Sequence, residues 1–285
     1  MWQARKESNI THKLPPMRCD IRTVNVCRRQ GEWQVIAHYV EGEALSAQLL
    51  TTLSQEAKEK LYEDFADFLL TLHALPVSML DERYADESDT YGLGYWLGAL
   101  CDKLLCYKRT YLSFRRTDKN LYTSLSFKRE KARLYEQFDS SPDDREQIES
   151  IIRAVSTTPG LYSLQCLCFR DLVTGNIIYD KSTGRLGALD FTCRYRGHVY
   201  GDFVKVYAWL GKDFTRQLVN QYNKMARQRG TRLPKCPTLP LVIDFTMVEY
   251  LTALWLFRKM PTHKGRRDLL RKTLQDIFHT PAPDA

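Results

Sequence analysis

Long apolar runs are absent from this sequence of 285 residues. A helix that spans a membrane needs roughly 20 consecutive apolar residues, and every apolar run here is far shorter. The first residues, Met1 to Glu7, lack the apolar centre of a secretory signal. We therefore expect a cytoplasmic protein without a membrane span.

Paired cysteine spacing is also missing. The sequence has eight cysteines, but none are arranged as C-x-x-C, and the closest pair is Cys166 and Cys168. Disulfide frameworks and zinc sites both depend on regular spacing. We expect reduced, buried thiols.

Acidic residues are scarce near the end of the chain. Residues 205–285 hold 15 Lys and Arg but only 6 Asp and Glu, in a chain of net charge +8. Such a region could meet nucleic acid, an anionic membrane surface or an acidic substrate. No recognisable nucleic-acid module interleaves these charges with aromatics, so we expect a solvated helical face and no nucleic-acid partner.

Polar residues at strand ends are the main feature that is present. Apolar alternation up to Cys168 predicts one strand, residues 176–179 a second and residues 185–191 a third. Residues 181–184 form a polar turn that ends in glycine and joins the last two as a hairpin. Asp171, Asn176 and Asp190 can then converge on one point.

This set of side chains suits phosphoryl transfer, which needs a carboxylate to orient and deprotonate a hydroxyl and an Asn and an Asp to hold magnesium. Asp171 would be the base, and Asn176 and Asp190 would be the metal ligands. A surface hairpin with incidental Asp and Asn turn residues is the alternative that spacing alone leaves open.

Several motifs resemble one family. Residues 169–176, F-R-D-L-V-T-G-N, resemble the H-G-D-L-x-x-x-N loop of aminoglycoside phosphotransferases and their choline kinase relatives. Asp190 lies where that family has its metal-binding Asp, and Asp202 matches the second Asp of its G-D-P-x-x-D-L segment. Residues 72–76 resemble its L-H-x-L-P signature. Phe169 and His198 replace a His and an Asp of the family pattern.

The resemblance implies an α+β, protein-kinase-like two-lobe fold. Residues 1–41 would form a short β-containing nucleotide lobe with the hinge. Residues 42–285 would form a large, mainly helical catalytic and acceptor-binding lobe that carries the catalytic β-hairpin. The cofactors would be ATP and Mg²⁺. The cofactor-binding positions would be the backbone of three hinge residues, near the adenine, and a first-lobe helix glutamate: His38, Tyr39, Val40 and Glu7.

The first lobe is short for this fold. Five strands and a helix need upwards of about 60 residues, and no glycine-rich loop or V-A-I-K-like strand precedes the helix. The lysine that grips the nucleotide phosphates is missing or displaced, with Lys6 or Lys13 as stand-ins. Either coding sequence lies upstream, or the lobe is reduced.

Other elements follow from local pattern. We expect a helix from Arg5 to Leu14, strands over 20–29 and 33–40, and a helix that begins at Thr52 or Ser54 and is ended by Pro76. Further helices are expected over 202–210, 214–229 and 243–259. His73 should pack near the catalytic loop with a backbone hydrogen bond, rather than act as a base.

The predicted function is ATP- and Mg²⁺-dependent transfer of the γ-phosphate to a hydroxyl of an aminoglycoside-, choline- or sugar-like acceptor. The alternative is a catalytically impaired pseudoenzyme that binds a ligand or partner. A small protein kinase is disfavoured, because Thr192 rather than Gly follows Asp190-Phe191 and no A-P-E is present.

Overall fold

The computed structural model describes residues 4, 7, 8, 11–76, 146, 150, 166–169, 172, 175–191, 195–197, 199–230 and 237–247. The chain divides into two compact units, one of residues 1–92 and 160–242 and the other of 93–159 and 243–285. Most described residues belong to the first unit. The predicted lobe boundary after residue 41 stays a prediction, because this unit includes residues on both sides of it.

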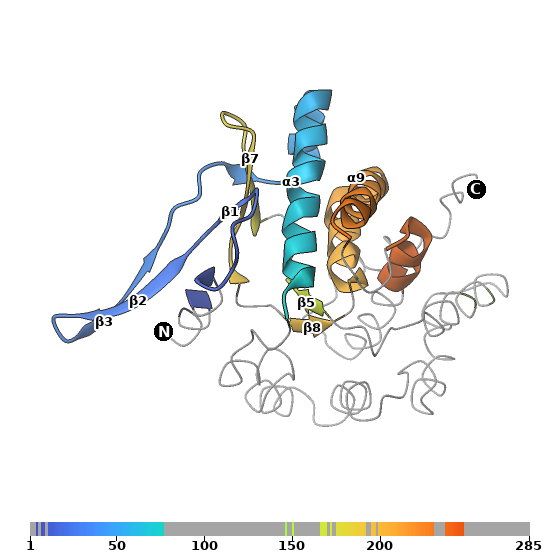
Figure 1. Ribbon diagram of the computed structural model, residues 1–285. Coiled ribbons are helices and arrows are strands. Elements are labelled where there is room, and N and C mark those ends of the chain that lie inside the picture. Colours follow the sequence, from blue (N-terminus) through green and yellow to red (C-terminus); the bar gives the residue numbers. More distant parts are fainter. Residues whose placement is uncertain are drawn as a thin grey trace, which may run out of the picture. The chain divides into compact units, whose positions relative to one another are not determined.

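A four-stranded sheet lies at the centre of the described region (Figure 1). Its strand order is β1-β7-β6-β4, with bounds β1 Asp20–Ile21, β7 Arg185–Ala188, β6 Ile177–Asp180 and β4 Glu43–Ala44. The β6 and β7 strands are antiparallel, which confirms the predicted hairpin. The β1 strand is parallel to β7, and β4 is antiparallel to β6.

The turn of this hairpin is closed by its own side chains. Asp180 accepts hydrogen bonds from the backbone N–H and hydroxyl of Ser182 and from the hydroxyl of Thr183. These bonds hold the pKa of Asp180 down at about 2. Gly184 completes the turn with φ of 64°, a conformation that glycine adopts without strain.

A separate hairpin is formed by β2, Val24–Arg29, and β3, Glu32–Ala37. Gln30 and Gly31 both have positive φ, as a two-residue turn that matches strand twist requires. The prediction of one strand over 20–29 is wrong. Its first two residues pair with β7 instead, and the N–H of Arg22 donates to Ala188, so the chain leaves one sheet before it enters the other.

The predicted helix before Pro76 is confirmed as α3, Gln55–Ala74, which follows the short helix α2, Ala47–Thr51. Ser54 caps α3, because its hydroxyl accepts from the N–H of Ala57. Pro76 cannot continue the helix. The 3.6-residue period of apolar side chains predicts one buried face from Leu61 to Leu75. Most of this face is buried as expected (Leu61, Phe65, Phe68, Leu69 and Leu72), whereas Leu75, after the last helical residue, is only half-buried.

Helix α9, Tyr200–Gln228, packs beside α3 (Figure 1). The two helices predicted over 202–210 and 214–229 form this one element, with a kink at Gly211, where φ is 81°. Phe214 lies after the kink, and its ring is 5.0 Å from that of Tyr62 and 6.1 Å from that of Phe65. Burial of each such ring stabilises the fold by about 1.5–3 kcal/mol. The helix predicted from Ile243 begins earlier, since residues 239–247 are already helical.

Strand β5, Cys166–Cys168, contacts α3 and pairs antiparallel with β8, Tyr195–Gly197. The four cysteines in the described ranges are free thiols; Cys19, Cys166 and Cys168 are buried, as predicted, and Cys27 is only half-buried. None of the helices within those ranges combines the length and the apolar content that crossing a membrane requires.

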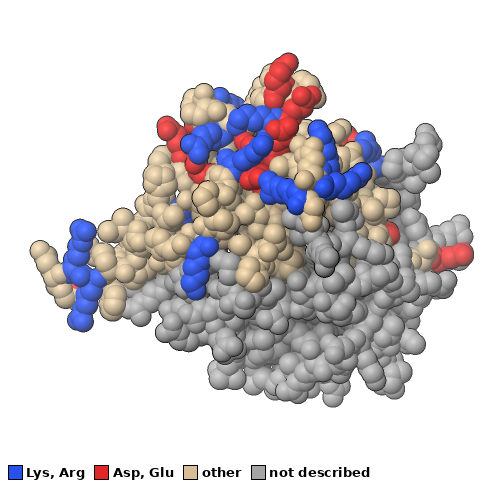
Figure 2. Space-filling view, viewed as in Figure 1, with Lys and Arg blue, Asp and Glu red and all other residues tan. Residues whose placement is uncertain are grey.

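Acidic and basic side chains are interleaved on the face drawn in Figure 2. Several form ion pairs, such as Lys60 with Asp64 at 2.8 Å and Arg18 with Glu63 at 3.1 Å. Exposed pairs of this kind stabilise a protein by about 0–1 kcal/mol each. In these two pairs a basic side chain lies next to an acid.

Candidate active site

Asn176 and Asp190 lie at the same end of the β6–β7 hairpin. Ile177 is paired with Ala188, and one step beyond them the N–H of Leu189 donates to the carbonyl of Asn176 at 2.8 Å. Asp190 is the next residue. Both predicted metal ligands are therefore brought to one edge, opposite the turn of residues 181–184, and both are half-buried.

The backbone of Asp190 has an uncommon conformation, with φ of 56°. A left-handed conformation costs a residue other than glycine roughly 1–2 kcal/mol, although aspartate tolerates it better than most. Such residues concentrate at functional sites, where the surrounding structure holds them in place. Asp190 adopts this conformation two residues after the end of β7.

Three buried aromatic rings hold the residues next to this site. The ring of Phe191 lies 4.8 Å from that of Phe169, edge to face, and the ring of Phe68 lies 6.2 Å and 5.8 Å from them. Edge-to-face pairs add about 0.5–1.5 kcal/mol to the burial of the rings. Phe169 takes the position of a histidine in the family pattern and packs here as an apolar residue.

Asp202 fixes the start of the predicted catalytic loop. Its Oδ2 accepts a hydrogen bond from the N–H of Phe169 at 2.9 Å and another from Nε2 of His73 at 3.0 Å. The hydroxyl of Tyr222 lies 2.8 Å from Nδ1 of His73. The expected backbone hydrogen bond of His73 is therefore wrong, because its partners are side chains on α9. Its packing near the loop is as predicted.

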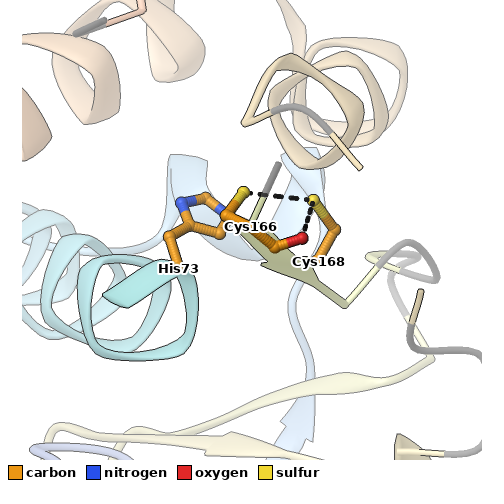
Figure 3. Close-up of side chains that lie close together, drawn as sticks. All are labelled: His73, Cys166 and Cys168. Carbon is orange, nitrogen blue, oxygen red and sulfur yellow. Dashed lines mark hydrogen bonds between the residues drawn. The ribbon is translucent and has the colours of Figure 1, made fainter. Parts of the chain in front are cut away.

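Cys166 and Cys168 lie beside His73 (Figure 3). Their sulfur atoms are 3.6 Å apart, and the potential ligand atoms of the three residues all lie within 4.8 Å of one another. Both ring nitrogens of His73 already have hydrogen-bond partners, so neither can bind a metal ion without the loss of one such bond. The arrangement is that of a buried hydrogen-bond network between β5 and the two long helices.

The network changes the acidity of its members. The hydrogen bond from Cys168 is the largest effect on Cys166 and lowers the pKa of its thiol. Burial works against a charged imidazole at His73, but the charge on Cys166 and the hydrogen bond and charge of Asp202 outweigh it. The pKa of His73 therefore lies above its ordinary value of 6.5.

Asp171, the predicted base, lies outside the described residues. Its neighbours Phe169 and Leu172 are described, and both side chains are buried. The role of Asp171 therefore stays a prediction from the sequence.

The predicted hinge, residues 38–40, lies against the four-stranded sheet that contains β6 and β7. The N–H of His38 donates to Thr23 at 2.8 Å, and the side chains of His38 and Tyr39 are exposed. Val40 packs so closely on Gly187 of β7 that a Cβ there would lie 2.3 Å from its Cγ1. Gly42 likewise lies against the backbone of Tyr179 in β6. The hinge backbone therefore runs across the hairpin that carries Asn176 and Asp190.

Glu7 lies in a helical stretch and is buried. Its two carboxylate oxygens accept from Nη2 of Arg22, at 2.9 Å and 3.1 Å. The sequence did not single out Arg22, because nothing local indicated that the chain before it pairs with β7. The available signal was weak: a cation that lies between the two-residue strand Asp20–Ile21 and the strand that begins at Val24.

Residues 27–234 match the phosphotransferase enzyme family known as APH. No curated protein matches the chain in sequence. Among solved structures, aminoglycoside phosphotransferase APH(2″)-IIa with gentamicin is similar, with 19% identity and a TM-score of 0.52 over 98% of this chain and 82% of that one. The GDP and kanamycin complex of APH(2″)-IIIa has 15% identity and a TM-score of 0.61 over 98% and 84%.

The macrolide 2′-phosphotransferase MphH from Brachybacterium faecium is also similar, with 11% identity and a TM-score of 0.51 over 99% of this chain and 81% of that one. These structures confirm the predicted α+β, protein-kinase-like fold. The family match spans most of the chain. The chain therefore belongs to the phosphotransferase enzyme family and is a small-molecule kinase, as the resemblance in its sequence implied.

Proposed function

We propose that this phosphotransferase moves the γ-phosphate of ATP, in the presence of Mg²⁺, to a hydroxyl group of a small-molecule acceptor. The observation that carries the proposal is the position of Asn176 and Asp190. They lie at one end of a hairpin whose face is crossed by the predicted hinge. Metal ligands and an adenine-binding backbone are two of the parts of a nucleotide site.

The donor set suits magnesium. Mg²⁺ prefers oxygen ligands and usually binds one or two carboxylates together with water and phosphate oxygens. Asp190 offers a carboxylate and Asn176 an amide oxygen. The carbonyl of Asn176 accepts from the N–H of Leu189, the residue before Asp190. When bound, the ion would neutralise charge that develops on the transferred phosphate. Asn176 and Asp190 would hold it in place.

Asp171 would act on the acceptor. Phosphoryl transfer involves little covalent chemistry by the protein, so the carboxylate orients the attacking hydroxyl and takes its proton. The buried neighbours Phe169 and Leu172, and the bond from Phe169 to Asp202, anchor the chain on either side. That anchoring supports a fixed position for the base.

Nucleotide use is supported by the similar structures. They include an ADP-bound APH(2″)-Ib and a ternary complex of APH(2″)-IIa with streptomycin and ATP, while APH(2″)-IIIa was solved with GDP. We propose ATP for this chain, with the backbone of His38 to Val40 at the adenine. GTP is the matched alternative nucleotide for a test.

The acceptor is proposed by class only. The similar enzymes carry gentamicin, kanamycin or streptomycin, and cationic acceptors of that kind are held by carboxylates. The C-terminal region here is rich in Lys and Arg, which disfavours a strongly cationic acceptor. A panel of sugars, amino alcohols and aminoglycosides spans the remaining choices.

The test is a transfer assay. The purified chain is incubated with ATP, Mg²⁺ and the acceptor panel, and products are read by mass spectrometry. We expect one acceptor class to gain a phosphate, and Asp171→Asn to abolish the gain. Absence of nucleotide binding to the wild-type chain, with either ATP or GTP, would overturn the proposal.

A further inference from the structure

We propose that Arg22 is the phosphate-binding cation of this chain. Its guanidinium, held by Glu7, would contact the phosphates of the nucleotide beside the metal held by Asn176 and Asp190. The inference rests on the function proposed above and assigns a residue that the sequence motifs leave unassigned. Three features of Arg22 support this role: its position next to the sheet, its partner Glu7 and its remaining donors.

Arg22 lies at the same sheet end as the candidate metal ligands. Ile21 is paired with Ala188, and the N–H of Arg22 donates to the carbonyl of Ala188 at 3.0 Å. On the other side of β7, Leu189 bonds to Asn176. Because neighbouring strands are about 4.7–4.9 Å apart, Arg22 lies one strand away from the Leu189–Asp190 step.

Glu7 holds the guanidinium in position. Both of its carboxylate oxygens accept from Nη2 of Arg22, at 2.9 Å and 3.1 Å. The side chain of Glu7 is only 6% exposed, while that of Arg22 is 30% exposed. A buried carboxylate needs a close cation, so Glu7 restrains Arg22 and leaves part of the arginine open to a ligand.

The guanidinium has donors to spare. An arginine presents five N–H groups, and here the recorded hydrogen bonds all come from Nη2. Nε is buried and makes no hydrogen bond within the described residues, so the donors left for a ligand are those of Nη1. A planar fork with unused donors matches the oxygens of a phosphate better than a lysine ammonium does.

Protein kinases use a lysine on a strand, paired with a helix glutamate, to hold the nucleotide phosphates. In this chain the helix glutamate has an arginine partner, which directly follows β1, the strand that pairs with β7. Of the lysines considered as stand-ins, Lys13 is exposed, and Lys6 lies outside the described residues. Arg22 is therefore the cation that Glu7 orients.

A purely structural ion pair is the competing explanation, and a phosphate-specific measurement separates the two. The dissociation constants of ATP with Mg²⁺ and of adenosine are measured by titration for the wild type, Arg22→Lys and Arg22→Gln. Because Arg22→Gln leaves the buried Glu7 carboxylate without a cation, the double variant Glu7→Gln with Arg22→Gln is measured beside it. Arg185→Gln is the matched control, since Arg185 lies at the other end of β7 and pairs with Asp20.

We expect Arg22→Gln and the double variant to weaken ATP binding by about 10- to 100-fold, as the loss of a charge-assisted hydrogen bond implies. Adenosine binding should stay within about twofold of the wild type, and Arg22→Lys should be intermediate. Arg185→Gln should bind ATP as the wild type does.

Unchanged ATP affinity in the double variant would overturn the assignment of Arg22, and so would an equal loss for ATP and adenosine. Failure of the proposed function is a different result, since the wild-type chain itself would then bind no ATP.

Discussion

The backbone N–H of Phe169 donates to Oδ2 of Asp202 at 2.9 Å, and both residues are almost completely buried. This bond joins β5 and the loop after it to the first turn of α9. The same oxygen accepts from His73 on α3. One carboxylate thus connects three elements at the point where the predicted catalytic loop begins.

Asp202→Ala is expected to destabilise the protein by about 3–5 kcal/mol, because it removes two buried hydrogen bonds to a carboxylate and leaves their donors unsatisfied. Urea unfolding measures the change. Asp213→Ala is the control on the same helix: the Asp213 side chain is 90% exposed and pairs only with Arg216 among the described residues. It should cost less than about 1 kcal/mol. Equal effects of the two changes would contradict the role of Asp202.

The stabilisation that His73 provides should depend on pH. Its pKa is raised in the folded protein, against the burial that would lower it, by the charge on Cys166 and by Asp202. A raised folded pKa gives stability that is fully present below the unfolded value of 6.5 and is lost as the pH rises through the folded pKa. The free energy of unfolding of the wild type minus that of His73→Gln should therefore fall as the pH rises above 6.5. A difference that grows with pH would have the wrong sign.

Gly42 should not accept a side chain. Its φ is 127°, and a Cβ would lie 2.7 Å from the carbonyl carbon of Tyr179 in β6. Gly42→Ala is expected to cost about 2–4 kcal/mol, since it combines overpacking with backbone strain. Gly31→Ala isolates the strain alone, because Gly31 also has positive φ but open space around it, and about 1–2 kcal/mol is expected. Thermal unfolding of both variants is the measurement, and a cost at Gly42 no larger than that at Gly31 would refute the close contact.

The hairpin and α3 could be predicted because their signals are local. Strand alternation with a polar turn ending in Gly184 specifies the hairpin, and the Ser54 cap and Pro76 bound the helix. The position of Asn176 and Asp190 at one end of the hairpin followed from the strand alternation and the polar turn. The motif resemblance supplied the chemistry.

Long-range pairing could not be predicted in the same way. The parallel pairing of Asp20 with Gly187 joins segments far apart in the sequence, and two residues of strand carry too little periodicity to indicate it. The Glu7–Arg22 ion pair depends on that pairing. The side-chain partners of His73 were missed for a related reason, because α9 meets α3 only in the folded chain.

The most direct test of the account is the rate of phosphate transfer as Mg²⁺ is varied, for the wild type, Asp190→Asn and Asp180→Asn. Asp180 is the matched control, since it lies at the turn end of the same hairpin with its own hydrogen bonds. We predict a Mg²⁺-dependent rate that falls at least about 100-fold in Asp190→Asn and changes by less than about twofold in Asp180→Asn. A wild-type rate for Asp190→Asn at every Mg²⁺ concentration would contradict the assignment of this hairpin end as the metal site.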